Sequence, residues 1–308
     1  MLKILLLAVA VLPALAGEAD LETFETYVYG HNMVGRPAAM SWQVVAEDRH
    51  GMGGRAVTKT VRLRFDKRPD SPVMELALTL PAANLPAPVF LIAGNVRLNP
   101  APVLKRGYGV VACRVDQIQS DAPNGYAKSI RGYLAPPGQT EPGKEEWGAM
   151  GAWAWGMSRA MDYLETDPDV NAKRVALNGA MRYAQVVLWA GAQDRRFALT
   201  VAQEPGFGTS ILRQIQGRFG YWFDRRLADY AGNEKDLPVD WAKLVALHTP
   251  RPVYLATTEE SGPEDARAVE LIAQHAGSKV GYHHRAGEHP QTPEDWEKYL
   301  DFADRYWK

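Results

Sequence analysis

Apolar and polar residues alternate between positions 61 and 80, on either side of a polar break at 69–72. Alternation with a period of two puts the apolar side chains on one face of a half-buried strand. The break contains Pro69, Asp70 and Ser71, residue types that favour turns. The sequence therefore predicts two antiparallel strands joined as a hairpin near the N-terminus.

Beyond this hairpin, the apolar residues come in short runs without polar alternation, which suits strands buried on both faces. The runs lie at 88–92, 108–112, 174–177, 198–201 and 252–256. Apolar residues at helical spacing lie between or after them, at 147–165, 183–191, 263–276 and 293–307. Because strands and helices alternate, we predict an α/β fold, a three-layer α/β/α sandwich with a mostly parallel central sheet.

Composition adds limits on organisation and partners. The chain has 308 residues, 46% of them hydrophobic, and no Gly/Ser tract or charge run that would mark a seam, so we expect a single domain over 17–308. With a net charge of -1 there is no global basic field, which argues against nucleic acid as a partner. We expect a monomer, although the sequence leaves the oligomeric state open.

The first 16 residues have the form of a signal peptide. Lys3 precedes an apolar run from 4 to 12, and Ala14-Leu15-Ala16 has the small-x-small form that signal peptidases cut. A buried N-terminal helix is the alternative, since the run is too short to span a bilayer. We therefore expect a secreted or periplasmic protein with no membrane contact after cleavage. Cys113 is the only cysteine, so no intramolecular disulfide forms, and its place in a strand predicts an inert thiol.

The segment 175–184 predicts a strand that enters a Gly-bearing turn and then a helix, which is the layout of a nucleophile elbow. An elbow holds one side chain at its tip, above the sheet, beside backbone N–H groups that can bind an oxyanion. Met181 occupies that tip. A thioether cannot become an alkoxide, so Met181 cannot act as the nucleophile, and an ordinary strand-to-helix corner is the competing interpretation.

Two further loops carry an acid and a base. Glu204 follows the run at 198–201, and His289 lies in the last loop before the final helix, within 281–290. This order of nucleophile, acid and histidine is that of α/β-hydrolases. A zinc site is the rival interpretation, but adjacent His283 and His284 would point to opposite sides of a strand, so we expect no metal.

Longer motifs resemble the glucuronoyl esterase family, from about Phe24 to the C-terminus. They include Glu146-Trp147-Gly148-Ala149, Ala152-Trp153-Ala154-Trp155-Gly156, Ser158-Arg159-Ala160-Met161-Asp162-Tyr163-Leu164, Leu188-Trp189-Ala190-Gly191-Ala192, Pro250-Arg251-Pro252-Val253-Tyr254 and Asp295-Trp296-Glu297-Lys298-Tyr299-Leu300. The resemblance implies an α/β-hydrolase fold. It also implies cleavage, without metal or cofactor, of the ester between a glucuronic acid branch of xylan and a lignin alcohol.

The serine of this family lies in a Gly-x-Ser-Arg-x-Gly-Lys motif, which falls here on residues 179–185. Gly179 and Arg182 match, whereas Met181, Ala184 and Gln185 replace the serine, the second glycine and the lysine. The resemblance implies that Arg182 lies beside the oxyanion and that Gln185 keeps a hydrogen bond to the sugar without the charge.

The resemblance also assigns the remaining site residues. It implies that Glu204 is the acid, that His289 is the base and that Trp222 lies against the uronic acid. In some bacterial relatives the acid comes from the loop after the 252–256 strand, which here offers Glu259 and Glu260.

Three functions stay open. The first is a pseudo-esterase that binds a glucuronic acid-bearing carbohydrate or its esters, with Arg182 pairing with the carboxylate and Trp222 offering a stacking face. The second is an active ester hydrolase in which His289 and a carboxylate activate water directly. The third is a scaffold without a ligand, in which Met181 fills space. Ser210 follows the acid loop and not an elbow, so we do not expect it to replace the nucleophile.

Overall fold

The computed structural model describes residues 17–32, 34–94, 98–207, 213, 215, 217, 219–276 and 279–308. The signal peptide predicted at 1–16 and Ser210 therefore lie outside the described residues. Within them, nine strands form one sheet in the order β1-β2-β3-β5-β4-β6-β7-β8-β9. The strands are β1 (Ser41–His50), β2 (Ala56–Arg64), β3 (Val73–Pro81), β4 (Ala87–Ala93), β5 (Gly109–Cys113), β6 (Val170–Ala180), β7 (Leu199–Gln203), β8 (Val253–Thr258) and β9 (Val280–Arg285).

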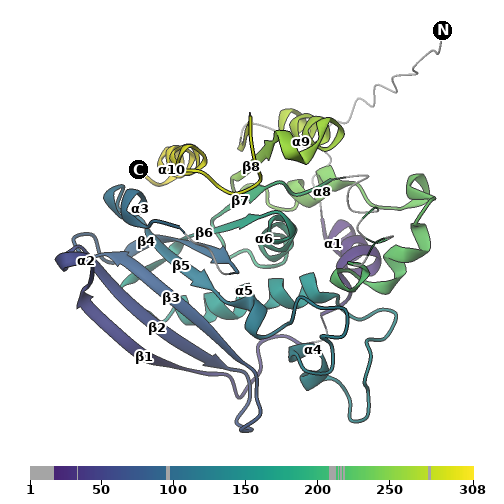
Figure 1. Ribbon diagram of the computed structural model, residues 1–308, viewed down its shortest axis with the longest axis horizontal. Coiled ribbons are helices and arrows are strands. Elements are labelled where there is room, and N and C mark those ends of the chain that lie inside the picture. The colour runs from purple at the N-terminus through teal and green to yellow at the C-terminus, as the bar shows by residue number, and fades with distance from the viewer. Residues whose placement is uncertain are drawn as a thin grey trace.

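The sheet divides into an antiparallel and a parallel part. β1, β2 and β3 pair antiparallel with one another, and β3 pairs antiparallel with β5. From β5 through β4, β6, β7 and β8 to β9, every pairing is parallel. The antiparallel strands project from one end of the molecule in Figure 1. This is the mostly parallel sheet with an N-terminal antiparallel hairpin that the sequence predicts.

Helices cover both faces of the sheet and give three layers. The helices are α1 (Glu18–Phe24), α2 (Gly51–Gly54), α3 (Ala101–Lys105), α4 (Ile130–Leu134), α5 (Ala149–Leu164), α6 (Arg182–Gln193), α8 (Trp241–Ala246), α9 (Pro263–His275) and α10 (Pro293–Trp307). A π-helical turn spans Glu25–Tyr29, and short 3-10 helices span Val115–Gln117, Gly220–Trp222, Arg225–Tyr230, Glu234–Asp236 and Glu259–Ser261.

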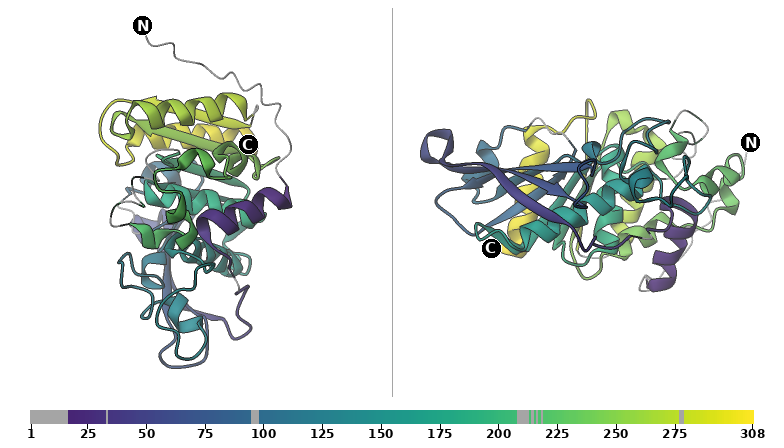
Figure 2. Two further views of the ribbon diagram at one scale, coloured as in Figure 1. Left: turned by 90° about the vertical axis from the view of Figure 1, so that its right-hand side faces the viewer. Right: turned by 90° about the horizontal axis from the view of Figure 1, so that it is seen from below.

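Two apolar clusters lie on the two sides of the sheet. One joins buried residues of α5, α6, α8 and α9, and the other joins residues of α3 and α10. Figures 1 and 2 show α9 and α10 flanking the β8–β9 edge. Among the described residues, no helix has the length and apolar character needed to cross a membrane.

The expected hairpin, buried strands and helices are all present, but two strands differ from the expectation. β1 was missed because nearly all of its side chains are exposed, so no apolar period marks it. Residues 281–285, expected as a loop, belong to β9, whose sequence is rich in His and Arg. Cys113 is buried on β5, where burial raises the pKa of its thiol, in agreement with the expected inertness.

One buried histidine makes the fold sensitive to acid. His248 follows α8, and its Nδ1 lies 3.1 Å from the Leu244 carbonyl oxygen. In the part of the chain that the structure describes, its Nε2 has no hydrogen-bond partner. A Cβ on Gly191 of α6 would lie 2.5 Å from that Nε2, so the ring is tightly enclosed. Burial, helped by the charge of Arg251, lowers the pKa of His248 to about 3.

This pKa shift predicts the sign of a pH effect. Between pH 6.5 and about 3 the unfolded chain binds a proton at His248 that the folded chain does not, so stability falls as pH falls through this window. We expect His248→Asn, which keeps a donor for the Leu244 carbonyl, to remove about 2 kcal/mol of the stability loss between pH 7 and pH 5. Urea unfolding of both proteins at pH 7 and pH 5 measures this difference in the free energy of unfolding.

His275→Asn is the matched control, because His275 makes the same type of bond to the Leu271 carbonyl oxygen from an exposed position. We expect this variant to lose as much stability as the wild type. Equal losses in the wild type and His248→Asn would show that His248 does not carry the effect.

Candidate active site

The loops that follow β6, β7, β8 and β9 meet at the carboxyl end of the sheet, where ligands of open α/β sheets bind. They surround a pocket of about 400 Å³. Its lining includes Asp121, Met150, Met181, Arg182, Gln185, Glu204, Phe219, Trp222, Glu260, Asp265 and His289. The structure thus gathers the predicted site residues, except Glu259, around one pocket.

The elbow between β6 and α6 is formed as predicted. Met181 has φ 56° and ψ −127°, a backbone conformation that residues other than glycine rarely adopt. Its N–H donates to the Gln203 carbonyl oxygen at 2.9 Å. A Cβ on Gly179 would lie 2.2 Å from the Tyr183 carbonyl oxygen, so only glycine lets the helix approach the strand. The Met181 side chain is 44% exposed and offers no hydroxyl.

The acid and the base are in contact. A Glu204 carboxylate oxygen contacts His289 Nδ1, and the other oxygen accepts hydrogen bonds from the hydroxyls of Thr258 and Ser261. Glu204 is buried, and its own backbone has φ 57°. Of the acids left open by the sequence, Glu204 is therefore the one at Nδ1. Thr258 was not predicted, although its place at the end of β8 could have suggested it.

Glu260 and Glu259 hold the histidine loop from the other side. Glu260 Oε2 accepts the backbone N–H of His289 at 2.7 Å and lies 3.5 Å from His289 Nε2. Glu259 accepts the backbone N–H of Gly287 at 3.0 Å and does not contact the imidazole. A carboxylate therefore lies on each side of the His289 ring, and Glu259 serves only the loop.

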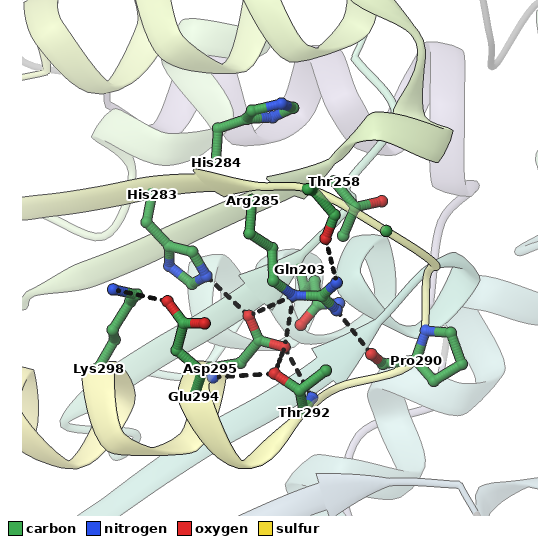
Figure 3. Close-up of polar contacts among 12 residues, drawn as sticks. Gln203, Thr258, His283, His284, Arg285, Pro290, Thr292, Glu294, Asp295 and Lys298 are labelled. Carbon is green, nitrogen blue, oxygen red and sulfur yellow. Dashed lines mark hydrogen bonds and ion pairs between the residues drawn. The ribbon is translucent and has the colours of Figure 1, made fainter.

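A buried network anchors the same loop from below, as Figure 3 shows. Arg285 donates to the Pro290 carbonyl oxygen at 2.7 Å and to Asp295 at 2.9 Å. Burial disfavours the Asp295 carboxylate, but hydrogen bonds from His283 and Arg285 outweigh it and hold its pKa below the usual value. Asp295 also forms a capping box with Thr292, which starts α10.

The two neighbouring histidines do not form a metal site. His283 Nε2 lies 2.8 Å from Asp295, whereas His284 Nδ1 lies 3.0 Å from the Thr257 hydroxyl. They point to opposite sides of β9, as expected from strand geometry (Figure 3). Within the described part of the chain, no group of three or more His, Cys, Asp or Glu side chains is arranged to hold a metal ion.

Arg182, which the sequence predicts at the ligand, has a counterion in the protein itself. Arg182 Nε lies 3.0 Å from Asp121 Oδ2, and its guanidinium lies 4.7 Å from the centroid of the Tyr183 ring. Asp121 therefore competes with any ligand carboxylate for Arg182, and the role of Arg182 in binding a sugar carboxylate stays a prediction. Asp121 was missed because it is a lone acidic residue in a loop, with no motif around it.

Trp222 and Gln185 line the pocket but are largely engaged by the protein. The Trp222 ring is 6% exposed, stacks on Phe219 at 4.4 Å and donates its N–H to Asp121 at 2.7 Å. Gln185 is 2% exposed, accepts a hydrogen bond from Tyr29 and donates to the Pro205 carbonyl oxygen at 2.5 Å. The Gln185 amide therefore ties the elbow helix to the acid loop.

Comparison with known proteins identifies relatives over most of the chain. A family model described as "Glucuronyl esterase, fungi" matches residues 66–281. Carbohydrate esterase MZ0003, from an unknown prokaryotic organism, is 32% identical over 92% of this chain and 83% of that protein. The solved structure of a glucuronoyl esterase from Solibacter usitatus is 33% identical, with a TM-score of 0.84, over 94% of this chain and 92% of that one.

A fungal relative matches a smaller part. The 4-O-methyl-glucuronoyl methylesterase 1 of Phanerochaete chrysosporium is 31% identical over 56% of this chain, and the match spans 38% of that protein. Likeness to the prokaryotic proteins thus extends over nearly the whole fold, and likeness to the fungal protein over about half of it.

The backbone of Met181 generates a stability prediction. We expect Met181→Gly to be more stable than Met181→Ala by about 1 kcal/mol, because glycine alone adopts φ 56° without strain. Both variants lose the same largely exposed side chain, so alanine is the control for lost packing. Urea unfolding measures the difference, and an alanine variant as stable as the glycine variant would show that the elbow is unstrained.

Proposed function

The chain belongs to the glucuronoyl esterase family, and from that premise we propose that it is a pseudo-esterase, which binds uronate-bearing carbohydrate esters and does not cleave them. The observation that carries this proposal is Met181 at the tip of the elbow. The elbow, the acid and the base keep their relative places, whereas the group that would attack the ester carbonyl has no ionisable atom.

The chemistry of the triad supports a large loss of rate. In a serine hydrolase His289 would take the proton of the attacking hydroxyl, and Glu204 would orient the imidazole through Nδ1. With a thioether at the tip, no proton is available and no acyl-enzyme forms. Loss of the serine in such enzymes lowers kcat about 10⁶-fold, and the residual rate then comes only from substrate binding and oxyanion contacts.

The charges of the pocket favour an ester over a free uronate. Its lining holds the carboxyl groups of Asp121, Glu204, Glu260 and Asp265, against the cations Arg182 and, when protonated, His289. A free carboxylate would add a like charge to this set, whereas an esterified one is neutral. Relatives of this chain carry names such as 4-O-methyl-glucuronoyl methylesterase, which agrees with an esterified uronic acid as the ligand.

A serine-free ester hydrolase is the second candidate, and the preserved contact between Glu204 and His289 favours it. In that mechanism His289 Nε2 takes a proton from water, which attacks the ester carbonyl, and the alcohol leaves with a proton from the imidazole. Glu260, 3.5 Å from Nε2, lies where such a water would be held. A scaffold without a ligand is less favoured, because a pocket of about 400 Å³ lies above the elbow.

The proposal extends to the location, oligomeric state and partners of the protein. We propose that residues 1–16 export the chain to the periplasm or the exterior, where glucuronic acid-bearing carbohydrate is encountered. We further propose that the protein works as a monomer, without metal or cofactor and without nucleic acid as a partner.

Restoring the serine tests the proposal. We expect wild-type protein to leave benzyl glucuronate intact. We expect Met181→Ser to hydrolyse it at a rate at least about 10³-fold above that of the wild-type sample. Release of benzyl alcohol measures both rates. Met52→Ser is the matched control, since Met52 is also an exposed methionine with φ 53° but lies far from the pocket.

The double variant Met181→Ser/His289→Ala should be silent again, because the new serine needs its base. Turnover by the wild type that disappears in His289→Ala would contradict the pseudo-esterase and establish the serine-free route.

A further inference from the structure

A second pocket, of about 450 Å³, lies behind the wall of the first. Tyr221 lines this second pocket and donates its hydroxyl to Asp121, which lines the first, at 2.7 Å. The lining comprises Ala122, Pro123, Asn124, Tyr126, Ala127, Arg131, Thr140, Glu141, Pro142, Glu146, Gly220, Tyr221, Phe223 and Arg225. The family triad does not reach this space.

Arg131 of α4 is an unusual lining residue because it is buried and, among the described residues, lies in no direct ion pair. It is 5% exposed, and within the described ranges its buried Nε has no hydrogen-bond partner. The centroid of the Tyr126 ring lies 5.1 Å from its guanidinium carbon. Burial lowers the pKa of Arg131 to about 10. Tyr126 and Glu146 act in the opposite direction, but a carboxylate in direct contact would offset more of the free-energy cost of burying this cation.

The carboxylates nearby are already engaged. Glu146 accepts hydrogen bonds from the Tyr126 hydroxyl at 3.2 Å and from Gln139 at 2.7 Å. Glu141 pairs with Arg225 at 3.1 Å, at the exposed side of the pocket. The charge of Glu146 still acts on Arg131, but neither carboxylate is in direct contact with the guanidinium, so the described part of the chain leaves a place for an acceptor from outside.

We propose that this pocket binds the free carboxylate of an acidic sugar through Arg131. A guanidinium binds a carboxylate with two parallel hydrogen bonds, and the pocket volume lies in the range of small-ligand sites. Tyr126 and Pro123 supply apolar surface for a sugar ring, and Asn124 and Thr140 supply polar groups for its hydroxyls.

This site goes beyond the proposed function and does not depend on it, because the two pockets suit different forms of a uronic acid. In the first pocket four carboxyl groups outnumber the cations, which suits an ester. In the second, Arg131 and Arg225 balance Glu141 and Glu146, so the free acid adds no like charge to an anionic set. An acidic glycan with an esterified and a free uronate would fit both.

Calorimetric titration with sodium glucuronate tests the proposal. We expect the wild type to bind one equivalent, and Arg131→Gln to weaken binding at least about tenfold, as expected for the loss of a charged hydrogen-bonding group. Arg182→Gln, in the first pocket, should bind as the wild type does. Ala127→Trp is a second variant, which fills the pocket from an exposed position and leaves Arg131 in place; it should also weaken binding.

Each other outcome overturns the proposal. Absence of binding to the wild type, or equal binding to the wild type and Arg131→Gln, contradicts it. Binding lost only in Arg182→Gln would assign the free uronate to the first pocket. Xylose binding as tightly as glucuronate would exclude the carboxylate as the recognised group, and acetate binding as tightly would exclude the sugar. Thermal unfolding shows whether Arg131→Gln folds, and removal of an unpaired buried charge predicts an unchanged or higher Tm.

Discussion

The strained turn between β6 and α6 is the constraint on which the site depends. Met181 keeps φ 56° because Gly179 allows α6 to approach the strand and the Met181 N–H is bound to β7. The same bond sets the end of β7 beside the elbow, and Glu204 follows directly. The turn thus positions both the tip of the elbow, where Met181 lies, and the acid. The backbone of the turn does this whichever side chain is at the tip.

The histidine loop is linked to the elbow through Gln203 and is also held by contacts of its own. Gln203 donates to the His289 carbonyl oxygen at 2.6 Å and accepts from Tyr299, while the Arg285–Asp295 pair fixes the chain on either side of the loop. Two carboxylates and a buried ion pair therefore keep His289 in the place of a base. None of these contacts involves the side chain at position 181, so they hold His289 in place with Met181 at the tip of the elbow.

Much of the fold was predictable because buried parallel strands and amphipathic helices leave strong patterns in a sequence. β1 was not, since its exposed side chains carry no period, and residues 281–285 were mistaken for a loop because polar residues dominate an edge strand. Met181 and Glu204 follow strand ends and were found by that rule, whereas His289 was found from its place in the last loop before the final helix. Asp121 and Arg131 were missed because their significance comes from tertiary neighbours: Asp121 pairs with Arg182, and the Nε of Arg131 is buried without a hydrogen-bond partner among the described residues.

The most direct test of the central claim, that the pocket above Met181 binds an esterified uronate, is carbon-13 NMR of methionine methyl groups during titration with methyl glucuronate. Met181 and Met150 line the pocket, and Met52 lies on another surface. We predict that the Met181 and Met150 methyl resonances shift with saturation, that Met52 does not, and that the ester stays intact. A Met181 resonance that does not move up to the solubility of the ester would contradict the claim.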